Sequence, residues 1–233
     1  MKSILTILCF VAGVFSVSAQ KVMDKGMVKM EITGITSEDP QMEAMLGGMK
    51  GSQTEVVFNK DNYVSTSDMM GGMIKVIVKV SHKDSTMNML FDAMGNKTWV
   101  ESKLDKAQSA QQKAIAEKNS ITYDKADTKE ILGYKCYKMT VTNPEMEGTT
   151  VSGYVCPDIK TDANIIQGFQ SVKFEGYPME FTVGSGQMAM TFTAKELTDK
   201  VDDSKFNLNT TGYTKMTMED FQKKMAQMGM GGF

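Results

Sequence analysis

Short segments in which apolar and polar side chains alternate recur along most of this chain. Residues 27–33 show the pattern, with Val28, Met30 and Ile32 separated by charged or polar residues. An alternation with a period of two is typical of a β-strand that buries one face and exposes the other. Segments rich in Gly, Asn, Asp and Ser interrupt the pattern at roughly ten-residue intervals, as turns between strands do. The chain is therefore predicted to fold mainly as an antiparallel β-sheet.

Turn-rich segments join several of the predicted strands into hairpins. The turns expected at 60–62, 82–85 and 92–96 are short enough to connect antiparallel neighbours. The strands expected after residue 33 lie at 53–59, 63–67, 74–81, 86–91, 97–100, 121–124, 133–142, 149–156, 173–174, 179–183 and 187–195. A series of hairpins is thus expected in the first half of the chain.

Two segments depart from the strand pattern. Residues 103–118 are rich in alanine, glutamine and lysine and contain no glycine or proline, so we expect a helix there, outside the sheet or across its mouth. A second helix is expected at 218–228, with Thr217 as its N-cap and Asp220 at the capping-box position. The tail rich in methionine and glycine from about 229 should fray. The predicted fold class is mainly β (α+β), with one internal and one C-terminal helix.

The first residues have the features of a secretory signal peptide. Lys2 precedes an apolar run at 4–17, and Val17-Ser18-Ala19 provides the small residues of a cleavage site before Gln20. The run is too short to span a bilayer comfortably, and no second long apolar stretch follows, so no membrane anchor is expected. We therefore expect a periplasmic or secreted protein in which 20–233 form a single domain.

Composition excludes several classes of function. All 26 basic residues are lysine, whereas arginine is the usual residue for contacts to phosphate and guanine, so no nucleic-acid partner is expected. The only histidine is His82, and the sequence contains neither a glycine-flanked nucleophile nor a glycine-rich phosphate loop. The chain is therefore predicted not to be an enzyme and to need no cofactor.

Two cysteines remain after the predicted cleavage. Cys136 and Cys156 are equidistant from Met146, which lies in the turn expected at 143–148. A hairpin that is symmetric about this turn places the two cysteines opposite each other, at a distance that a disulfide accepts. An oxidising compartment favours such a bridge. The alternative is that both are buried thiols in separate places.

Methionine is far more frequent than in an ordinary domain. The chain contains 23 methionines, and all except Met1 follow the predicted cleavage site. They cluster at 42–49, 69–73, 87–94, 188–190, 216–218 and 225–230. Three interpretations are open. The residues could replace leucine and isoleucine in the core, form an adaptable apolar binding surface, or bind Cu(I) through their thioethers. In the last case the glycines of 69–73 would let the loop fold around the ion.

The segment Ile131-Leu132-Gly133-Tyr134-Lys135-Cys136 and the flanking 153–159 and 174–179 resemble a known family. Its members are secreted proteins, described as domain of unknown function 4412, whose hallmark is an Ile-x-Gly-Tyr-Lys-Cys strand. The methionine-rich stretch 87–97 is also similar. The resemblance extends to the related GLPGLI family and to the outer-membrane lipoprotein carriers LolA and LolB. This chain lacks the GLPGLI sequence and the arginine that the carriers use.

The resemblance implies an antiparallel sheet curled into an open LolA-like half-barrel around helices, with an apolar concavity. We therefore expect an exported, non-enzymatic, carrier-like protein that holds a lipid or the acyl group of an envelope protein. The alternatives are a periplasmic Cu(I)-binding protein and a structural or partner-binding envelope protein. The residues expected to line or gate the cavity are Met69, Met70, Met73, Met87, Met89 and Trp99.

Overall fold

A single large β-sheet dominates the computed structural model, which describes residues 21–104, 114, 117–144, 148–161 and 173–227. Its twelve strands, in spatial order from one edge to the other, are β14, β7, β6, β5, β4, β3, β2, β13, β12, β10, β9 and β8. Their bounds are β2 (Gly26–Ser37), β3 (Gln53–Phe58), β4 (Asn62–Met69), β5 (Ile74–Ser81), β6 (Thr86–Ala93), β7 (Asn96–Lys103), β8 (Ser120–Ile131), β9 (Tyr134–Thr142), β10 (Thr149–Cys156), β12 (Tyr177–Ser185), β13 (Met188–Thr198) and β14 (Thr214–Met216). A separate parallel pair joins β1 (Lys21–Val22) to β11 (Ile159–Lys160).

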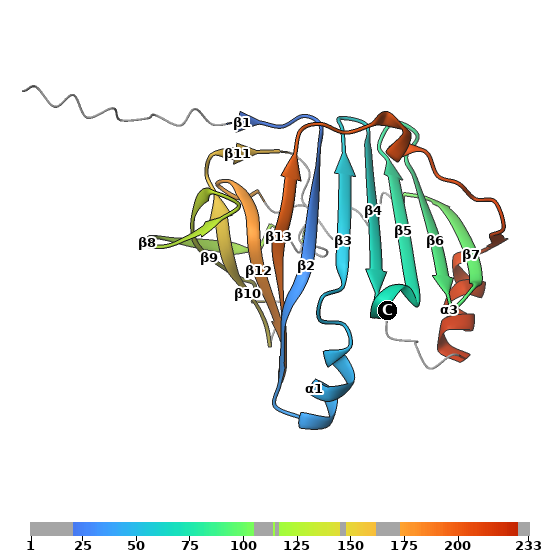
Figure 1. Cartoon of the computed structure of the whole chain (residues 1–233), viewed down its shortest axis with the longest axis horizontal. Helices are drawn as coiled ribbons and strands as arrows, with labels where there is room; N and C mark the ends of the chain where they lie inside the picture. The colour runs from blue at the N-terminus through green and yellow to red at the C-terminus, as the bar shows by residue number, and fades with distance from the viewer. Residues whose placement is uncertain (1–20, 105–113, 115–116, 145–147, 162–172, 228–233) are drawn as a thin grey trace, which may run out of the picture.

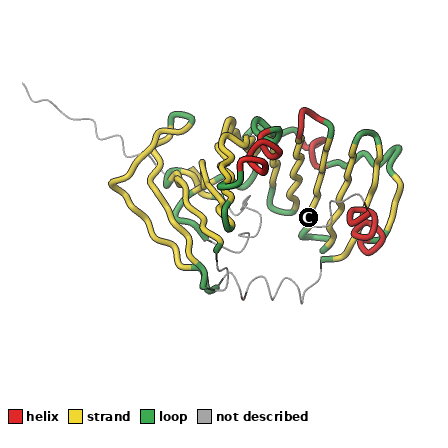
Figure 2. The backbone as a smooth tube through the Cα atoms, turned by 90° about the horizontal axis from the view of Figure 1, so that it is seen from below, coloured by secondary structure: helices red, strands yellow, loops and turns green. Residues whose placement is uncertain are grey.

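The twelve-stranded sheet is curled but does not close (Figures 1 and 2). All neighbouring strands are antiparallel except β14, which runs parallel to β7 at one edge. The long pairing of β2 with β13 brings an early and a late segment of the chain together at the centre of the sheet. The predicted mainly β fold with a curled, open antiparallel sheet is therefore confirmed.

The two faces of the sheet differ in polarity. One face, called the inner face here, carries the main apolar core, in which Val28, Val56 and Met139 are almost completely buried. The opposite, outer face carries polar side chains on β12 and β13 and a smaller apolar cluster that includes Val57 and Phe206. Because residues paired across antiparallel strands lie on the same side, the unbroken register of β3 to β7 assigns the residues of these strands to one face or the other.

The predicted C-terminal helix is confirmed as α3 (Met218–Gln227). The backbone N–H of Asp220 donates to Thr217 Oγ1 at 3.1 Å, as the predicted cap requires. Phe221 packs edge-on against Phe91 at 5.5 Å between ring centroids, and Met225 is buried in the same cluster. The helix α3 therefore covers the inner face at the β5–β7 end of the sheet.

The sequence did not predict α1 (Pro40–Gly47), which connects β2 to β3. Asp39 caps it, since its Oδ1 accepts from the backbone N–H of Gln41 at 2.8 Å, and Pro40 occupies its first turn. None of its residues is buried. The apolar periodicity that predicts a core helix is therefore missing. Two single turns, η1 (Met70–Gly72) and η2 (Asp203–Phe206), complete the helical elements of the described segments.

Several predictions fall wholly or partly outside the described residues. The predicted start of the helix at 103–118 is wrong, because Lys103 is the last residue of β7. Most of the rest of this predicted helix lies outside the described residues. The signal peptide at 1–19 and the tail from 228 also lie outside them. Residues 173–174, predicted as a strand, form a loop before β12. Among the described helices, none is long and apolar enough to cross a membrane.

Candidate functional site

An apolar patch on the inner face of β5 and β6 is the candidate site. Val80 pairs with Met87 and Val78 pairs with Met89, so these four side chains lie on one side of the sheet. All four are only partly buried. We call this group (Val78, Val80, Met87 and Met89) the inner patch. A contiguous group of partly exposed apolar side chains is a surface suited to an apolar partner.

The inner patch lies between two closed clusters. On the same strands, the next pair along the inner face is Val76 and Phe91, which belong to the cluster covered by α3. On the β4 side, Tyr63 pairs with Val80 and packs against the main core. The patch is therefore the part of the inner face of β5 and β6 that neither cluster covers.

The strands around the inner patch carry no charged residue on their inner face, and the charge nearest to it that we identify comes from α3, whose Lys224 Nζ donates to Thr98 Oγ1 at 3.2 Å. Across β4–β7, all of whose residues are described, the register places no Lys, Asp or Glu on the inner face. Lys79 lies on the outer face, where its Nζ donates to the carbonyl oxygen of Phe206 at 2.7 Å. Burial raises the pKa of Tyr63, so this phenol stays neutral at physiological pH. The inner face of these strands therefore favours an apolar chain over a charged ligand.

The structure separates the six residues that the sequence placed together. Met87 and Met89 belong to the inner patch, and Met69, paired with Ile74, lies on the inner face at the end of β4. Met70 and Met73 are exposed in the β4–β5 turn.

Trp99 lies on the outer face, paired with Leu90, so it is not on the same face as Met87 and Met89. Its Nε1 donates to Asn88 Oδ1 at 2.9 Å, and the Lys215 ammonium lies 4.4 Å from its ring centroid. Sequence reasoning missed Val78 and Val80, because the search for an unusual surface concentrated on methionine. Alternation within β5 alone groups these valines, but it does not tell which face of the sheet is concave.

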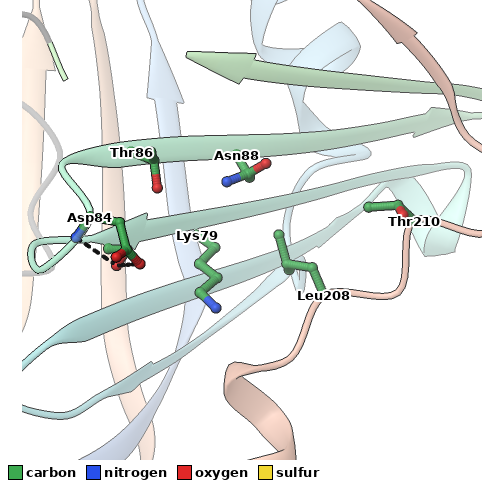
Figure 3. Close-up of a pocket in the computed structure, with 7 residues that line it drawn as sticks. Lys79, Asp84, Thr86, Asn88, Leu208 and Thr210 are labelled. Carbon is green, nitrogen blue, oxygen red and sulfur yellow. Dashed lines mark hydrogen bonds between the residues drawn. The ribbon is translucent and has the colours of Figure 1, made fainter. Parts of the chain in front are cut away.

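One cavity among the described residues lies on the outer face of β5 and β6 (Figure 3). It measures about 270 Å³ and is lined by Lys79, Ser81, Asp84, Thr86, Asn88, Leu208 and Thr210. The Ser81 hydroxyl donates to Asp84 Oδ2 at 2.8 Å. This cavity is polar and lies opposite the inner patch, so it is not the methionine-rich cavity that the sequence predicted.

A second cavity, of about 390 Å³, lies beside α1. Ile35, Pro40, Ala44 and Gly47 line it, together with Glu43 and Lys50. Neither cavity contains a residue of the inner patch. The inner patch therefore lines neither of these two cavities.

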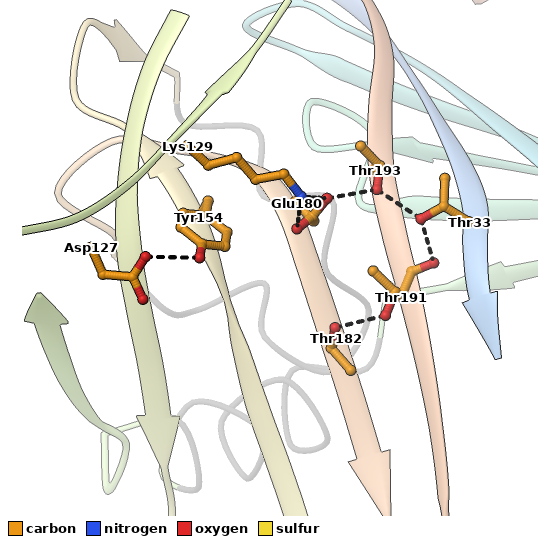
Figure 4. Close-up of polar contacts among 8 residues, drawn as sticks. All are labelled: Thr33, Asp127, Lys129, Tyr154, Glu180, Thr182, Thr191 and Thr193. Atoms are coloured by element: carbon orange, nitrogen blue, oxygen red, sulfur yellow. Dashed lines mark hydrogen bonds and ion pairs between the residues drawn. The ribbon is translucent and has the colours of Figure 1, made fainter. Parts of the chain in front are cut away.

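The outer face of the other half of the sheet carries a connected polar network (Figure 4). Glu180 accepts from Lys129 Nζ at 2.7 Å and from Thr193 Oγ1 at 3.0 Å, and the hydroxyl groups of Thr33 and Thr193 are 2.8 Å apart. Thr182 and Thr191 form another hydroxyl pair at 2.8 Å. These side chains hydrogen-bond to one another across β8, β12, β13 and β2. Such cross-strand side-chain pairs stabilise a sheet.

At the β8 end of this network, Asp127 has two donors. Its carboxylate accepts from Lys138 Nζ and from the Tyr154 hydroxyl, both at 3.0 Å. The hydrogen bond from Lys138, followed by that from Tyr154, lowers the pKa of Asp127. A carboxylate held in its ionised form by a lysine is poorly suited to act as a general acid or base near neutral pH.

The cysteines are neighbours, as the hairpin symmetry predicts. Val155 pairs with Tyr137, so the next pair in the same register is Cys156 and Cys136. Both are completely buried. The structure holds them as free thiols and not as the predicted bridge. The register prediction is therefore confirmed, whereas the disulfide itself stays a prediction for the exported, oxidised protein.

Among known proteins, the chain is only remotely similar to several solved structures. No family model and no curated protein matches it, so the resemblance to domain of unknown function 4412 and to GLPGLI stays a prediction. The lipoprotein LppX of Mycobacterium tuberculosis is similar at 11% identity and a TM-score of 0.38, over 77% of this chain and 89% of LppX.

LprF of Mycobacterium bovis is similar at 12% identity and a TM-score of 0.35, over 76% of this chain and 88% of LprF. A Pseudomonas aeruginosa MucA/MucB complex is similar at 9% identity and 0.35, over 79% of this chain and 56% of the matched one. Likenesses this remote say nothing about what the present chain binds.

Proposed function

We propose that this chain is an exported, non-enzymatic, carrier-like protein that holds an apolar chain, such as a lipid acyl group, against the inner patch. In this proposal residues 20–233 form one domain, and the acyl chain lies along β5 and β6. The observation that carries the proposal is the partly exposed apolar surface formed by the uncharged side chains of Val78, Val80, Met87 and Met89.

The chemistry of the inner patch supports this ligand class. Val78 and Val80 supply stiff, branched side chains, whereas Met87 and Met89 supply flexible thioethers that adapt to chains of variable shape. Each methylene of a ligand that leaves water contributes about 0.8 kcal/mol. A long acyl chain therefore gains appreciable affinity from an apolar surface without any hydrogen bond.

Met89→Lys tests the proposal. An acyl chain that covers a lysine ammonium on the inner patch would have to displace its hydration water, which costs free energy. We therefore expect the affinity for the acyl chain to fall by about tenfold or more. Met89→Leu keeps an apolar side chain of similar volume and should bind like the unmodified protein. The measurement is a titration with 11-(dansylamino)undecanoic acid, whose emission rises in apolar surroundings.

Thr86→Lys is the matched control, because Thr86 lies on the same strand but on the outer face and is also partly exposed. This variant should retain full affinity. Thermal unfolding of all variants verifies that each is folded. Equal binding by the folded Met89→Lys and Thr86→Lys variants would contradict the proposal, as would the absence of any binding by the unmodified protein.

A further inference from the structure

Exposed methionines gather at one end of the sheet. The large apolar side chains that are exposed among the described residues are Val22, Leu132, Met42, Met45, Met70, Met73 and Met94. Met42 and Met45 lie on α1, Met70 and Met73 lie in the β4–β5 turn, and Met94 lies in the β6–β7 turn. Figure 1 shows α1 and the β4–β5 turn at the same end of the sheet. Exposed bulky apolar residues in the turns are therefore all methionine, apart from Leu132.

Three of these methionines are held together by the backbone. The N–H of Met73 donates to the carbonyl oxygen of Met70, and the N–H of Met94 donates to that of Met73 at 2.9 Å. Ile74 pairs with Ala93, so the β4–β5 and β6–β7 turns are neighbours at this end of the sheet. The turn triad, Met70, Met73 and Met94, thus extends three flexible thioether side chains from adjacent backbone positions.

Two members of the turn triad occupy unusual backbone positions. Met70 has a φ of 53° and Met94 a φ of 50°, in the left-handed region that glycine and asparagine normally fill. Met94 is also 77% exposed. A long apolar side chain gains little from burial at such a position and adopts it at a conformational cost. Leu132 adopts the same conformation with a φ of 53° and is 43% exposed, so such a turn also accepts leucine. The β4–β5 and β6–β7 turns differ in that every exposed bulky side chain in them carries sulfur.

We propose that Met70, Met73 and Met94 bind one Cu(I) ion through their three thioether sulfurs. Thioethers are soft ligands that select Cu(I) over hard cations. Among the described residues, no group of three or more His, Cys, Asp or Glu is arranged to hold a metal ion. The site differs from the one expected from 69–73 alone, because Met69 lies on the inner face and Met94 takes its place. It is separate from the inner patch and does not depend on the acyl-chain proposal.

The test is an anaerobic competition for Cu(I) between the mature protein and bicinchoninate. The unmodified protein should withdraw one equivalent of Cu(I). The triple variant Met70→Leu, Met73→Leu and Met94→Leu keeps the bulk of the side chains and loses the sulfur, so its affinity should fall by about tenfold or more. The double variant Met42→Leu and Met45→Leu removes two equally exposed methionines at the same end of the sheet and should bind like the unmodified protein.

Leucine is close to methionine in volume, so we expect the variants to fold. Thermal unfolding verifies that they do. A triple leucine variant with the same Cu(I) affinity as the unmodified protein would overturn the proposal. It would assign the copper to other sulfurs, including Cys136 and Cys156. Failure of the unmodified protein to compete would also overturn it. So would a loss of affinity in the Met42 and Met45 variant that matches the loss in the triple variant.

Discussion

Replacing Gly153 with alanine should destabilise the fold by about 3 kcal/mol or more. Gly153 lies in the middle of β10, paired with Met139 on one side and Phe181 on the other. A Cβ at this position would come within 2.7 Å of the Phe181 Cα and closer still to the Glu180 carbonyl oxygen. Both are backbone atoms of β12 that cannot rotate away. The sheet must therefore shift to accept the methyl group.

The measurement is urea-induced unfolding of the Gly153→Ala variant, with Gly184→Ala as the matched control. Gly184 is also a strand glycine, but its Cβ would meet the Thr150 Oγ1, the end of a side chain that can rotate. We expect the control to change the free energy of unfolding by less than about 1 kcal/mol. Equal stability of the two variants would show that β10 and β12 do not approach as closely as described.

Reduction of the cysteine pair should lower the free energy of unfolding of the exported, oxidised protein by about 3 kcal/mol on the chain-entropy model. The register that pairs Val155 with Tyr137 brings Cys136 and Cys156 opposite each other. The hydrogen bond between the two thiols raises the pKa of Cys136 and lowers the pKa of Cys156. Both thiols are completely buried in the folded protein and so closed to an external oxidant, and we therefore expect oxidation as the chain folds after export.

Urea-induced unfolding with and without dithiothreitol checks this result, together with a thiol titration in denaturant. The double variant Cys136→Ala and Cys156→Ala is the control, because its stability cannot depend on the reductant. Two free thiols per chain in protein recovered from its native compartment would contradict the prediction. So would a stability that the reductant leaves unchanged.

The local part of the fold follows well from the sequence. The alternation in 74–81 and 86–91 and the turn between them predict the β5–β6 hairpin, and the symmetry about Met146 predicts the β9–β10 register. The pairing of β2 with β13 could not be predicted in this way, because it joins segments more than a hundred residues apart and no local pattern specifies a partner at that distance. The helix α1 buries no residue and so has no apolar periodicity to detect.

The candidate site could be predicted only in part. The methionine pattern identified Met87 and Met89, but their neighbours Val78 and Val80 look like ordinary strand residues. Trp99 was grouped with Met87 and Met89, although it lies on the opposite face, because alternation within each strand does not tell how neighbouring strands are paired. The turn triad was beyond sequence reasoning, since Met94 joins Met70 and Met73 only through the contact between two hairpins.

A native mass spectrum of the mature protein, recovered from the envelope without detergent or added metal, tests the acyl-chain proposal most directly. We expect a population with an added mass in the range of a lipid, which should disappear when Met89 is replaced by lysine and persist when it is replaced by leucine. A protein that carries no lipid-sized mass in any of the three forms, and gains none after incubation with lipid vesicles, would contradict the proposal that the inner patch holds an apolar chain.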